Sequence, residues 1–260
     1  MKTDLSQFSH RSEEPENSVL YLVGTPIGNI NDISKRAINV LKYASIIICE
    51  DTRNTKFLLN QIDVTNKLMS FHQYNSKTKI PQILSRLKNG ESIAMVSDAG
   101  IPLISDPGEE LVKQVTLNKY DVVCIPGPCA AITALASSGL ETSRFVFFGF
   151  LARKGKERDF LLKSISNTPF TSIIYESPRR IKDLLLDLKN TCGDKRQVAI
   201  GRELTKKFEQ HLKSDIGKLI EYFNKIEPKG EFTIIVEGNK EKNNEIQSIN
   251  SLKNDLISLI

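Results

Sequence analysis

The chain has 260 residues, a net charge of +5, and 40% hydrophobic and 26% charged residues. This composition is typical of a globular protein with a substantial core in one large or two smaller domains. No apolar run reaches the roughly 20 residues of a membrane-spanning helix, so we expect no membrane association. The N-terminal residues lack a hydrophobic signal core, and the four scattered cysteines form no disulfide pattern; both features predict a cytoplasmic location. The three dispersed histidines suggest no metal site.

The first half of the chain alternates apolar strands with amphipathic helices. We expect strands at 19–23, 45–49, 92–96 and 120–125, and helices at 32–43, 54–61, 79–88, 109–118 and 129–138. Continuous apolar strands alternating with helices indicate an α/β fold with a mostly parallel sheet.

An extended segment at 144–150 interrupts this alternation, and we place a domain boundary there. We therefore expect an N-terminal α/β domain at 18–145 and a C-terminal α/β domain at 146–240. The flanks are a polar tail at 1–17 and a C-terminal extension at 241–260. In the second domain we expect helices at 157–166, 181–190 and 216–224, and strands at 171–175, 197–200 and 231–237.

The loop after the third strand, AMVSDAGIPLISDPG at 94–108, is the richest in special residues. Two glycines permit unusual backbone angles, two prolines stiffen the path, and Asp98 stands where the strand ends. Ligands of open α/β sheets bind at the carboxyl ends of the strands. The alternative interpretation is a rigid connection whose aspartates cap the next helix, and for the Asp106–Gly108 part this interpretation is preferred.

Two further loops connect a strand to a helix, at 24–29 and 126–131. Their small residues permit close approach of a ligand or tight packing of helix on sheet. Glu50 or Asp51 stands where a dinucleotide-binding fold has its ribose-binding acid, so a nicotinamide-dependent oxidoreductase remains an alternative. Pro26 disrupts the glycine pattern of that fold.

Charged motifs mark the second half. Basic residues cluster at 153–158, 179–182 and 206–213, all after position 150. The net charge permits an anionic partner, and this asymmetry between the halves is more informative than the total charge. The segments 176–180 and 202–209 combine carboxylates with cations at strand ends, and each taken alone is typical of an exposed turn. His72 is interpreted as a ring packed on a loop.

The motifs GTPIGN, EDTR, SFHQYN, SDAGIPLISDPG, PGPCA, FFGFLARKG, YESPRR, GRELTKKFE and GEFTIIVEG occur in this order between Val19 and Gly238. The set resembles the tetrapyrrole methylase family, in the branch that methylates small-subunit ribosomal RNA. Three residues depart from the usual family pattern: Gln73 for Glu, Ile101 for Thr and Cys129 for Ser. The C-terminal part is also shorter than in many relatives.

The resemblance implies two α/β domains of the class III methyltransferase type with a cleft between them that holds S-adenosylmethionine, and a homodimer. By motif, the implied cofactor contacts are Ile27, Ser97, Asp98, Ile101, Cys129, Ala130, Tyr175, Glu176, the Leu204-Thr205 region, Phe232 and Thr233.

The implied reaction is methyl transfer to the ribose 2′-hydroxyl of a cytidine in the decoding region of 16S rRNA within the small ribosomal subunit. The candidates for proton transfer are Asp51, Glu176, Glu203 and Lys206. The candidates for RNA contact are Arg53, Arg153, Lys154, Arg179, Arg180, Arg202 and Lys206. Two other functions remain beside the oxidoreductase: methylation of a tetrapyrrole or another small molecule by the same fold, and RNA binding without catalysis.

Overall fold

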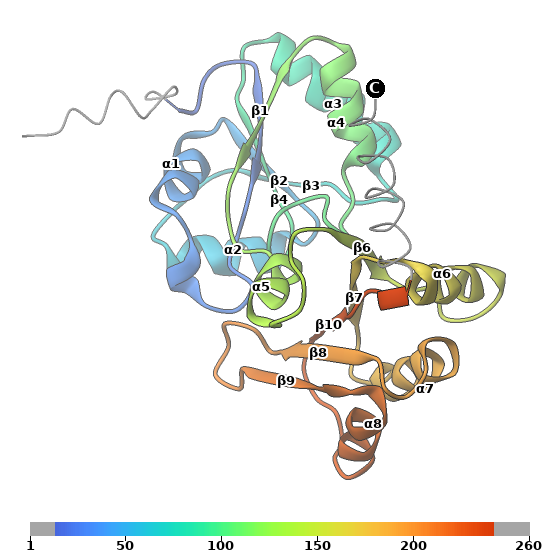
Figure 1. The fold of residues 1–260 in the computed structure, drawn as a ribbon. Coiled ribbons are helices and arrows are strands. Elements are labelled where there is room, and N and C mark those ends of the chain that lie inside the picture. The colour runs from blue at the N-terminus through green and yellow to red at the C-terminus, as the bar shows by residue number, and fades with distance from the viewer. Residues whose placement is uncertain (1–13, 242–260) are drawn as a thin grey trace, which may run out of the picture. The chain divides into compact units, whose positions relative to one another are not determined.

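The computed structural model describes residues 14–241, and its contacts divide the chain into two compact units between Cys129 and Ala130 (Figure 1). Each unit contains one five-stranded sheet. The mixed α/β class expected from the sequence is confirmed. The terminal segments 1–13 and 242–260 lie outside the described residues, and so do most of the expected tail and nearly all of the C-terminal extension.

The sheet of the first unit is entirely parallel, with strand order β3-β2-β4-β1-β5. Its strands are β1 (Val19–Val23), β2 (Ile46–Cys49), β3 (Leu68–Ser70), β4 (Ile93–Val96) and β5 (Asp121–Ile125). β1, β2 and β4 are buried at every position, which explains their continuous apolar sequences. β3 was not expected, because its three residues are too few for a periodic pattern.

Helices cover both faces of this sheet. The helices are α1 (Lys35–Tyr43), α2 (Thr52–Gln61), α3 (Ser76–Lys88) and α4 (Glu109–Leu117), with a short 3-10 turn at Ile30–Asp32. Residues of α1 and α2 pack with Tyr21 in one core cluster, and residues of α3 and α4 pack with Leu20 in another. Successive residues of β1 therefore face opposite helix layers.

The strand order creates a switch point between β1 and β4. These two strands pair side by side, yet the chain leaves β1 towards β2 on one side and leaves β4 towards β5 on the other. The helices that follow β1 and β4 pack on opposite faces of the sheet, and ligands of α/β proteins bind at the carboxyl ends of strands where this happens.

The second sheet is mixed rather than mostly parallel, with order β6-β7-β10-β8-β9. Its strands are β6 (Phe145–Phe150), β7 (Thr171–Glu176), β8 (Gln197–Arg202), β9 (Gln210–Asp215) and β10 (Phe232–Val236). Only β6 and β7 pair in parallel. β9 was not expected, because this half-exposed edge strand is polar and the sequence of its residues is typical of a basic cluster.

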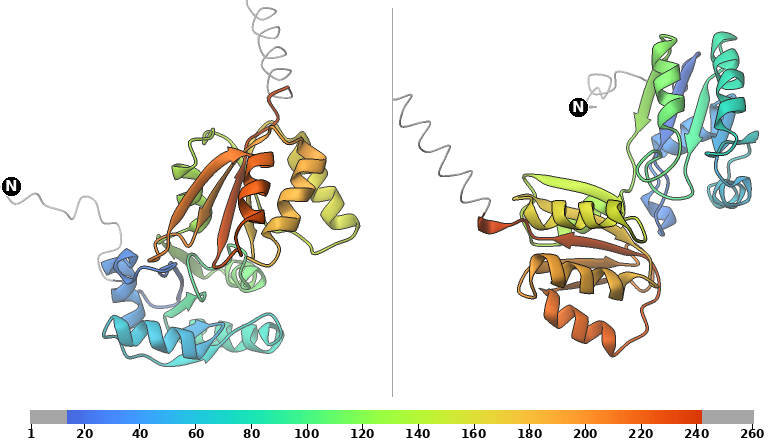
Figure 2. Two further views of the ribbon diagram at one scale, coloured as in Figure 1. Left: turned by 90° about the horizontal axis from the view of Figure 1, so that it is seen from below. Right: turned by 90° about the vertical axis from the view of Figure 1, so that its right-hand side faces the viewer.

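The helices of the second unit are α5 (Ala130–Ser137), α6 (Lys156–Asn167), α7 (Ile181–Cys192) and α8 (Ile216–Asn224). α6, α7 and α8 share one core with the sheet and lie along one of its faces (Figure 2). α5 contacts β7, β8 and β10. α5 was expected in the first domain because it continues the strand–helix alternation, but its contacts group it with the second sheet.

Among residues 14–241, no helix is long and apolar enough to cross a bilayer. No group of three or more potential ligand side chains within that range has the geometry of a metal site.

We predict that Gly24→Ala lowers the free energy of unfolding by about 2 kcal/mol, because overpacking at a backbone contact forces main-chain shifts. A Cβ at Gly24 would lie 2.7 Å from the Cα of Gly127. Urea denaturation measures the effect. The control is Gly217→Ala in α8, where the nearest atom is 3.5 Å from the added Cβ. The control should be neutral or stabilising by up to about 1 kcal/mol, and equal losses in the two variants would contradict the prediction.

Candidate functional site

Three strand-end loops of the first unit are joined at the switch point. The amide of Thr25 donates to the Gly100 carbonyl at 2.9 Å, and the amide of Gly100 donates back to Thr25 at 3.1 Å. Gly24 donates to the carbonyl of Ile125 at 3.1 Å and passes directly against Gly127. The loops after β1, β4 and β5 are therefore joined into one rigid frame at the carboxyl end of the sheet.

The loop at 97–108 has an unusual backbone. Gly100 and Gly108 have positive φ, and so do Leu103 (73°) and Ser105 (68°), which carry side chains. Positive φ in residues other than glycine costs of the order of 1 kcal/mol each, and such strain concentrates at functional sites. The two glycines were expected in this role, whereas nothing in the sequence marked Leu103 and Ser105.

This loop forms one wall of a pocket of about 1120 Å³ in the first unit. The other walls come from the ends of β2 and β3, so three motifs that are far apart in the sequence meet here. The pocket combines carboxylates with aromatic rings, and the lining residues used below are Glu50, Asp51, Phe71, His72, Tyr74, Asp98, Asp106, Glu109 and Glu110. Its volume is sufficient for a small organic ligand or a nucleoside.

Two aspartates of the loop differ in their surroundings. Asp98 is exposed and accepts a hydrogen bond from the side chain of Asn54 at 3.0 Å. Asp106 is half-buried, and burial raises its pKa. A hydrogen bond with Ser97 opposes this rise, while the carboxylates of Glu50 and Asp98 add to it. Asp106 was expected to have only a structural role, but it combines a position in the pocket wall with an increased affinity for a proton.

His72 is not simply packed on its loop, because its ring lines the pocket. Its Nε2 atom lies 3.2 Å from the side-chain amide of Asn75. When Nε2 accepts that hydrogen bond, Nδ1 carries the proton, and Nδ1 is buried with no hydrogen-bond partner in the described part of the chain. The neighbouring Tyr74 is 94% exposed, with its ring edge-on to His72.

Asp51 caps the N-terminus of α2. It accepts the Arg53 backbone amide at 2.8 Å and the Arg53 guanidinium at 3.1 Å and 2.6 Å. The hydrogen bonds from the Arg53 side chain and backbone lower the pKa of Asp51 to about 2. Asp51 is therefore a weak proton acceptor, and Arg53 is a paired but exposed cation.

In the second unit, Tyr175, Thr233 and Gly201 lie side by side in one row across β7, β10 and β8. The Tyr175 hydroxyl accepts the amide of Ala131 at 3.1 Å, which places this row on the α5 face of the sheet. Because side chains alternate along a strand, Glu176 and Phe232 point to the opposite face. Phe232 packs there against Phe223.

Glu176, one of the four candidates for proton transfer, is 2% exposed. One carboxylate oxygen accepts the amide of Ser177 at 2.8 Å, and the other lies 3.3 Å from the Arg180 guanidinium. This arrangement fixes the turn that leads into α7.

Lys206 holds the loop between β8 and β9 together. Its Nζ donates to Glu203 at 3.0 Å and to Glu231 at 2.8 Å. Partial burial opposes both charges, but these hydrogen bonds outweigh it, lowering the pKa of Glu203 and raising the pKa of Lys206. Both groups therefore stay ionised near neutral pH, and neither is poised to exchange a proton.

The same loop contains strained backbone and an orphaned polar atom. Glu203 and Thr205 have φ of 50° and 66°. The Thr205 amide donates to Glu209 at 2.9 Å, while its hydroxyl is buried with no hydrogen-bond partner among the described residues. A buried hydroxyl without a partner is costly, so this atom is available to a ligand.

The remaining expected cofactor contacts are half-buried: Ile27, Ile101 and Cys129 lie on connecting loops, and Ala130 begins α5. Ser97 is buried at the end of β4 and donates to the carbonyl of Ala99 at 3.2 Å.

The seven expected RNA contacts separate into two groups. Arg53, Arg180, Arg202 and Lys206 hold ion pairs or hydrogen bonds within the protein. Arg153, Lys154 and Arg179 are exposed and have no hydrogen bond or ion pair in the described part of the chain.

The family model "Tetrapyrrole (Corrin/Porphyrin) Methylases" matches residues 19–220. The chain therefore belongs to the tetrapyrrole methylase family, whose members use S-adenosylmethionine as the methyl donor. Within it, the chain is 46% identical over 242 residues to ribosomal RNA small subunit methyltransferase I of Halalkalibacterium halodurans, covering 93% of this chain and 82% of that protein. The protein of that name from Synechocystis is 42% identical, with 93% and 87% covered.

Solved structures agree on the fold. A cobalt precorrin-4 methyltransferase matches with a TM-score of 0.65 at 15% identity, covering 85% of this chain and 95% of that chain. A uroporphyrin-III C-methyltransferase from Thermus thermophilus, complexed with S-adenosyl homocysteine, matches with a TM-score of 0.59 at 15% identity, covering 84% and 96%. These likenesses confirm the two-domain methyltransferase fold expected from the motifs.

We predict that Lys206→Met lowers the free energy of unfolding by about 1 kcal/mol at pH 7, because it removes a partly exposed ion-pair network. The folded protein lowers the pKa of Glu203. Glu203 therefore stabilises the fold at pH values above its ordinary pKa of 4.5, and this stabilisation is lost as the pH falls through its pKa in the folded protein. The folded protein raises the pKa of Lys206. Lys206 therefore stabilises the fold at pH values below its ordinary pKa of 10.5, and this stabilisation is lost as the pH rises through its pKa in the folded protein.

Thermal unfolding at pH 7 and in mild acid measures this effect. The midpoint of the wild type should fall more steeply on acidification than that of Lys206→Met, since the variant no longer holds Glu203 ionised. Parallel pH profiles would contradict the prediction.

Proposed function

We propose that the protein transfers a methyl group from S-adenosylmethionine to the ribose 2′-hydroxyl of a cytidine in the decoding region of 16S rRNA, presented by the small ribosomal subunit. The observation that carries the proposal is the 46% identity, over most of both chains, to a protein named ribosomal RNA small subunit methyltransferase I. The tetrapyrrole methylase fold and the two groups of strand-end loops support it.

Both units offer groups that fit S-adenosylmethionine. In the first unit, Asp98 is an exposed carboxylate beside the rigid frame of Thr25 and Gly100, suited to ribose hydroxyls or to the cationic end of the cofactor. In the second unit, the orphaned hydroxyl of Thr205 and the row of Tyr175 and Thr233 offer polar contacts. When bound, the cofactor supplies an electrophilic methyl group.

Among the other expected contacts, Ile27, Ser97, Ile101, Cys129 and Ala130 offer loop backbone and small or apolar side chains. The side chains of Glu176 and Phe232 face away from the Tyr175 row. We therefore propose that these two residues support the cofactor site through their backbone and through the turn that Glu176 fixes.

The pocket of the first unit fits the target nucleotide. Carboxylates accept hydrogen bonds from the exocyclic amine of cytosine, and six of them line this pocket. Single-stranded RNA bases stack on aromatic side chains, and His72 and Tyr74 supply such rings. The same carboxylates repel phosphates, so we propose that an unstacked cytidine enters the pocket while its backbone stays outside.

The chain's contribution to catalysis is orientation and proton acceptance. Alignment of hydroxyl and methyl group supplies much of the rate. Asp51, Glu176, Glu203 and Lys206 are each engaged in an ion pair, which suits them to hold loops rather than to accept a proton. We assign proton acceptance to Asp106, whose burial raises its pKa within the pocket wall.

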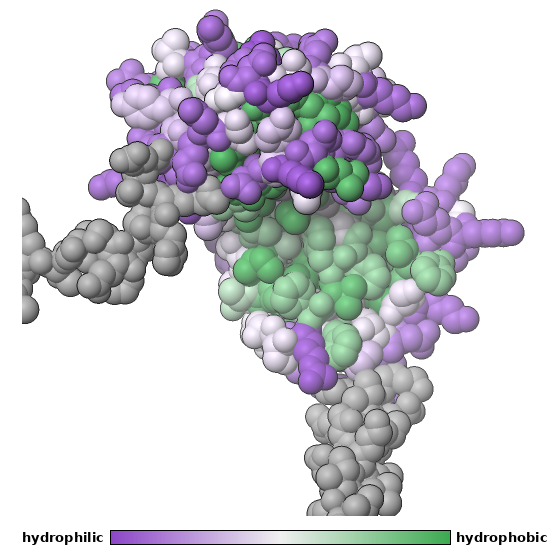
Figure 3. Space-filling view, turned by 90° about the horizontal axis from the view of Figure 1, so that it is seen from above, coloured by the Kyte–Doolittle hydropathy of each residue, from purple (hydrophilic) through white to green (hydrophobic). Residues whose placement is uncertain are grey.

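We also propose that the protein acts in the cytoplasm as a homodimer. The edge strand β6 exposes Phe145 and Phe150, and hydrophobic residues gather on one face of the molecule in the space-filling view (Figure 3). An exposed hydrophobic edge strand is a common site of association.

Methylation of small ribosomal subunits purified from cells that lack this gene tests the function. Nuclease digestion and mass spectrometry should show a new 2′-O-methylcytidine. A methyl group on the base would contradict the assigned position. Transfer to a precorrin but not to subunits would favour a small-molecule methylase, and calorimetric binding of NAD without binding of S-adenosylmethionine would favour the oxidoreductase.

We predict that Asp98→Ala weakens S-adenosylmethionine binding at least tenfold in calorimetry, because it removes a charge-assisted contact. The midpoint of thermal unfolding should change by only a few degrees, since Asp98 is exposed. Asp194→Ala, at an exposed carboxylate before β8, is the control and should leave binding unchanged. Equal loss of folding and binding in Asp98→Ala would instead favour a structural role for this carboxylate.

A further inference from the structure

A second pocket, of about 650 Å³, lies in the second unit at the start of α7. Four arginines line it: Arg153 from the segment after β6, Arg158 from α6, and Arg179 and Arg180 from the turn after β7. Because like charges repel, each of these guanidinium groups is stabilised by a carboxylate, a carbonyl or an anionic ligand close to it.

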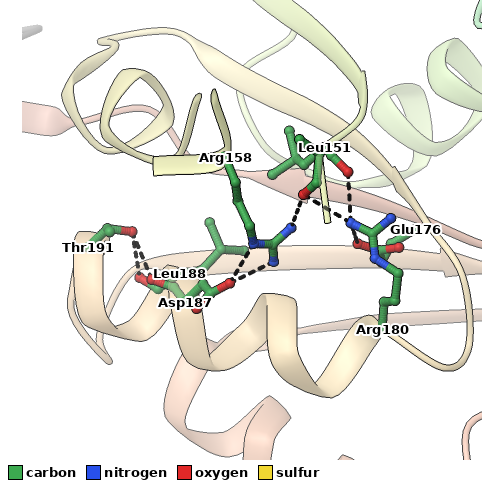
Figure 4. A network of polar contacts seen from close by, with 8 residues as sticks. Leu151, Arg158, Glu176, Arg180, Asp187, Leu188 and Thr191 are labelled. Carbon is green, nitrogen blue, oxygen red and sulfur yellow. Dashed lines mark hydrogen bonds and ion pairs between the residues drawn. The ribbon is translucent and has the colours of Figure 1, made fainter. Parts of the chain in front are cut away.

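Two of the four arginines are used within the protein. Arg158 is 7% exposed; it donates to Asp187 at 2.9 Å and 2.6 Å and to the carbonyl of Ala152 at 2.9 Å. Arg180 donates to the carbonyl of Leu151 at 2.7 Å and pairs with Glu176 (Figure 4). These contacts fix the segment after β6 and the turn after β7 onto α7.

The other two arginines have no such partners. Arg153 and Arg179 are exposed, and neither makes a hydrogen bond or ion pair within the described residues. Lys154 adds a third unpaired cation beside Arg153. Asp187 is neutralised by Arg158, so Asp183 is the one lining carboxylate without a hydrogen bond or ion pair among the described residues. The unpaired side chains around the pocket therefore carry a net positive charge. The backbone segments that bear them are held in place by Arg158 and Arg180.

We propose that this pocket binds phosphodiester groups of the RNA substrate through Arg153 and Arg179, while Arg158 and Arg180 hold the two segments that carry them. The inference rests on the proposed function and extends it by naming where the RNA backbone is held. Guanidinium groups match phosphate oxygens with paired hydrogen bonds. Contacts of this kind set the position of the RNA rather than reading its sequence.

The test compares Arg153→Ala/Arg179→Ala with wild type for binding to small ribosomal subunits that lack the modification. Affinity should fall at least tenfold at low salt. Each lost single-strand phosphate contact reduces the slope of log K against log salt by about 0.7, so the double variant should show a slope shallower by about 1.4. S-adenosylmethionine affinity and the unfolding midpoint should match wild type, because both side chains are exposed and unpaired.

The matched control is Lys163→Ala/Lys225→Ala, which removes two exposed cations of the same unit from α6 and from the end of α8. It should retain the wild-type slope. An equal change in slope in both double variants would overturn the proposal, because the effect would then report net charge rather than this pocket.

A variant that we expect to strengthen RNA binding completes the test. Asp183→Asn removes the unpaired carboxylate of the pocket and should strengthen binding about two- to fivefold. Weaker or unchanged binding in this variant would count against phosphate in the pocket. Methylation of subunits by the wild type separates the pocket assignment from the proposed function. If the wild type is active and the arginine double variant binds subunits as well as the wild type does, only the pocket assignment is overturned. If the wild type is inactive, the proposed function is overturned.

Discussion

Backbone pairing between Thr25 and Gly100 is the constraint on which the first unit's site depends. It joins the loops after β1 and β4, the two strands whose onward connections diverge. The contact of Gly24 with Gly127 adds the loop after β5, and that contact is possible only because neither residue has a Cβ. With these ends fixed, the strained segment at 100–108 is held over the ends of β2 and β3. The acidic and aromatic pocket is the consequence.

In the second unit, helices pack on both faces of the sheet. Three helices bury one face, and α5 covers part of the other. Tyr175 and Glu176 are adjacent in sequence but serve opposite faces: Tyr175 holds the start of α5, and Glu176 holds the turn before α7. A single residue of offset in β7 thus separates the hydroxyl that holds α5 from a buried carboxylate that holds α7.

The cations discussed above fall into two groups. Cations that pair with a neighbouring carboxylate, such as Arg53, Arg158 and Lys206, fix loops in place. Cations without partners stand on the segments so fixed, as Arg153 and Arg179 do. Because a guanidinium on a rigid backbone loses less entropy on binding than one on a mobile loop, the paired arginines prepare the unpaired ones for an anion.

The sequence by itself determined the family, the α/β class and most of the strands and helices, since these follow from ordered motifs and from local hydrophobic periodicity. It also marked the glycines and Asp98 of the loop at 94–108. Only the tertiary structure decided that Asp106 and His72 line a pocket, that α5 packs with the second sheet, that the polar β9 is an edge strand, and which arginines are free. These properties depend on partners distant in sequence: burial, strand register and ion pairing are set by what folds against a residue, and local sequence does not contain that information.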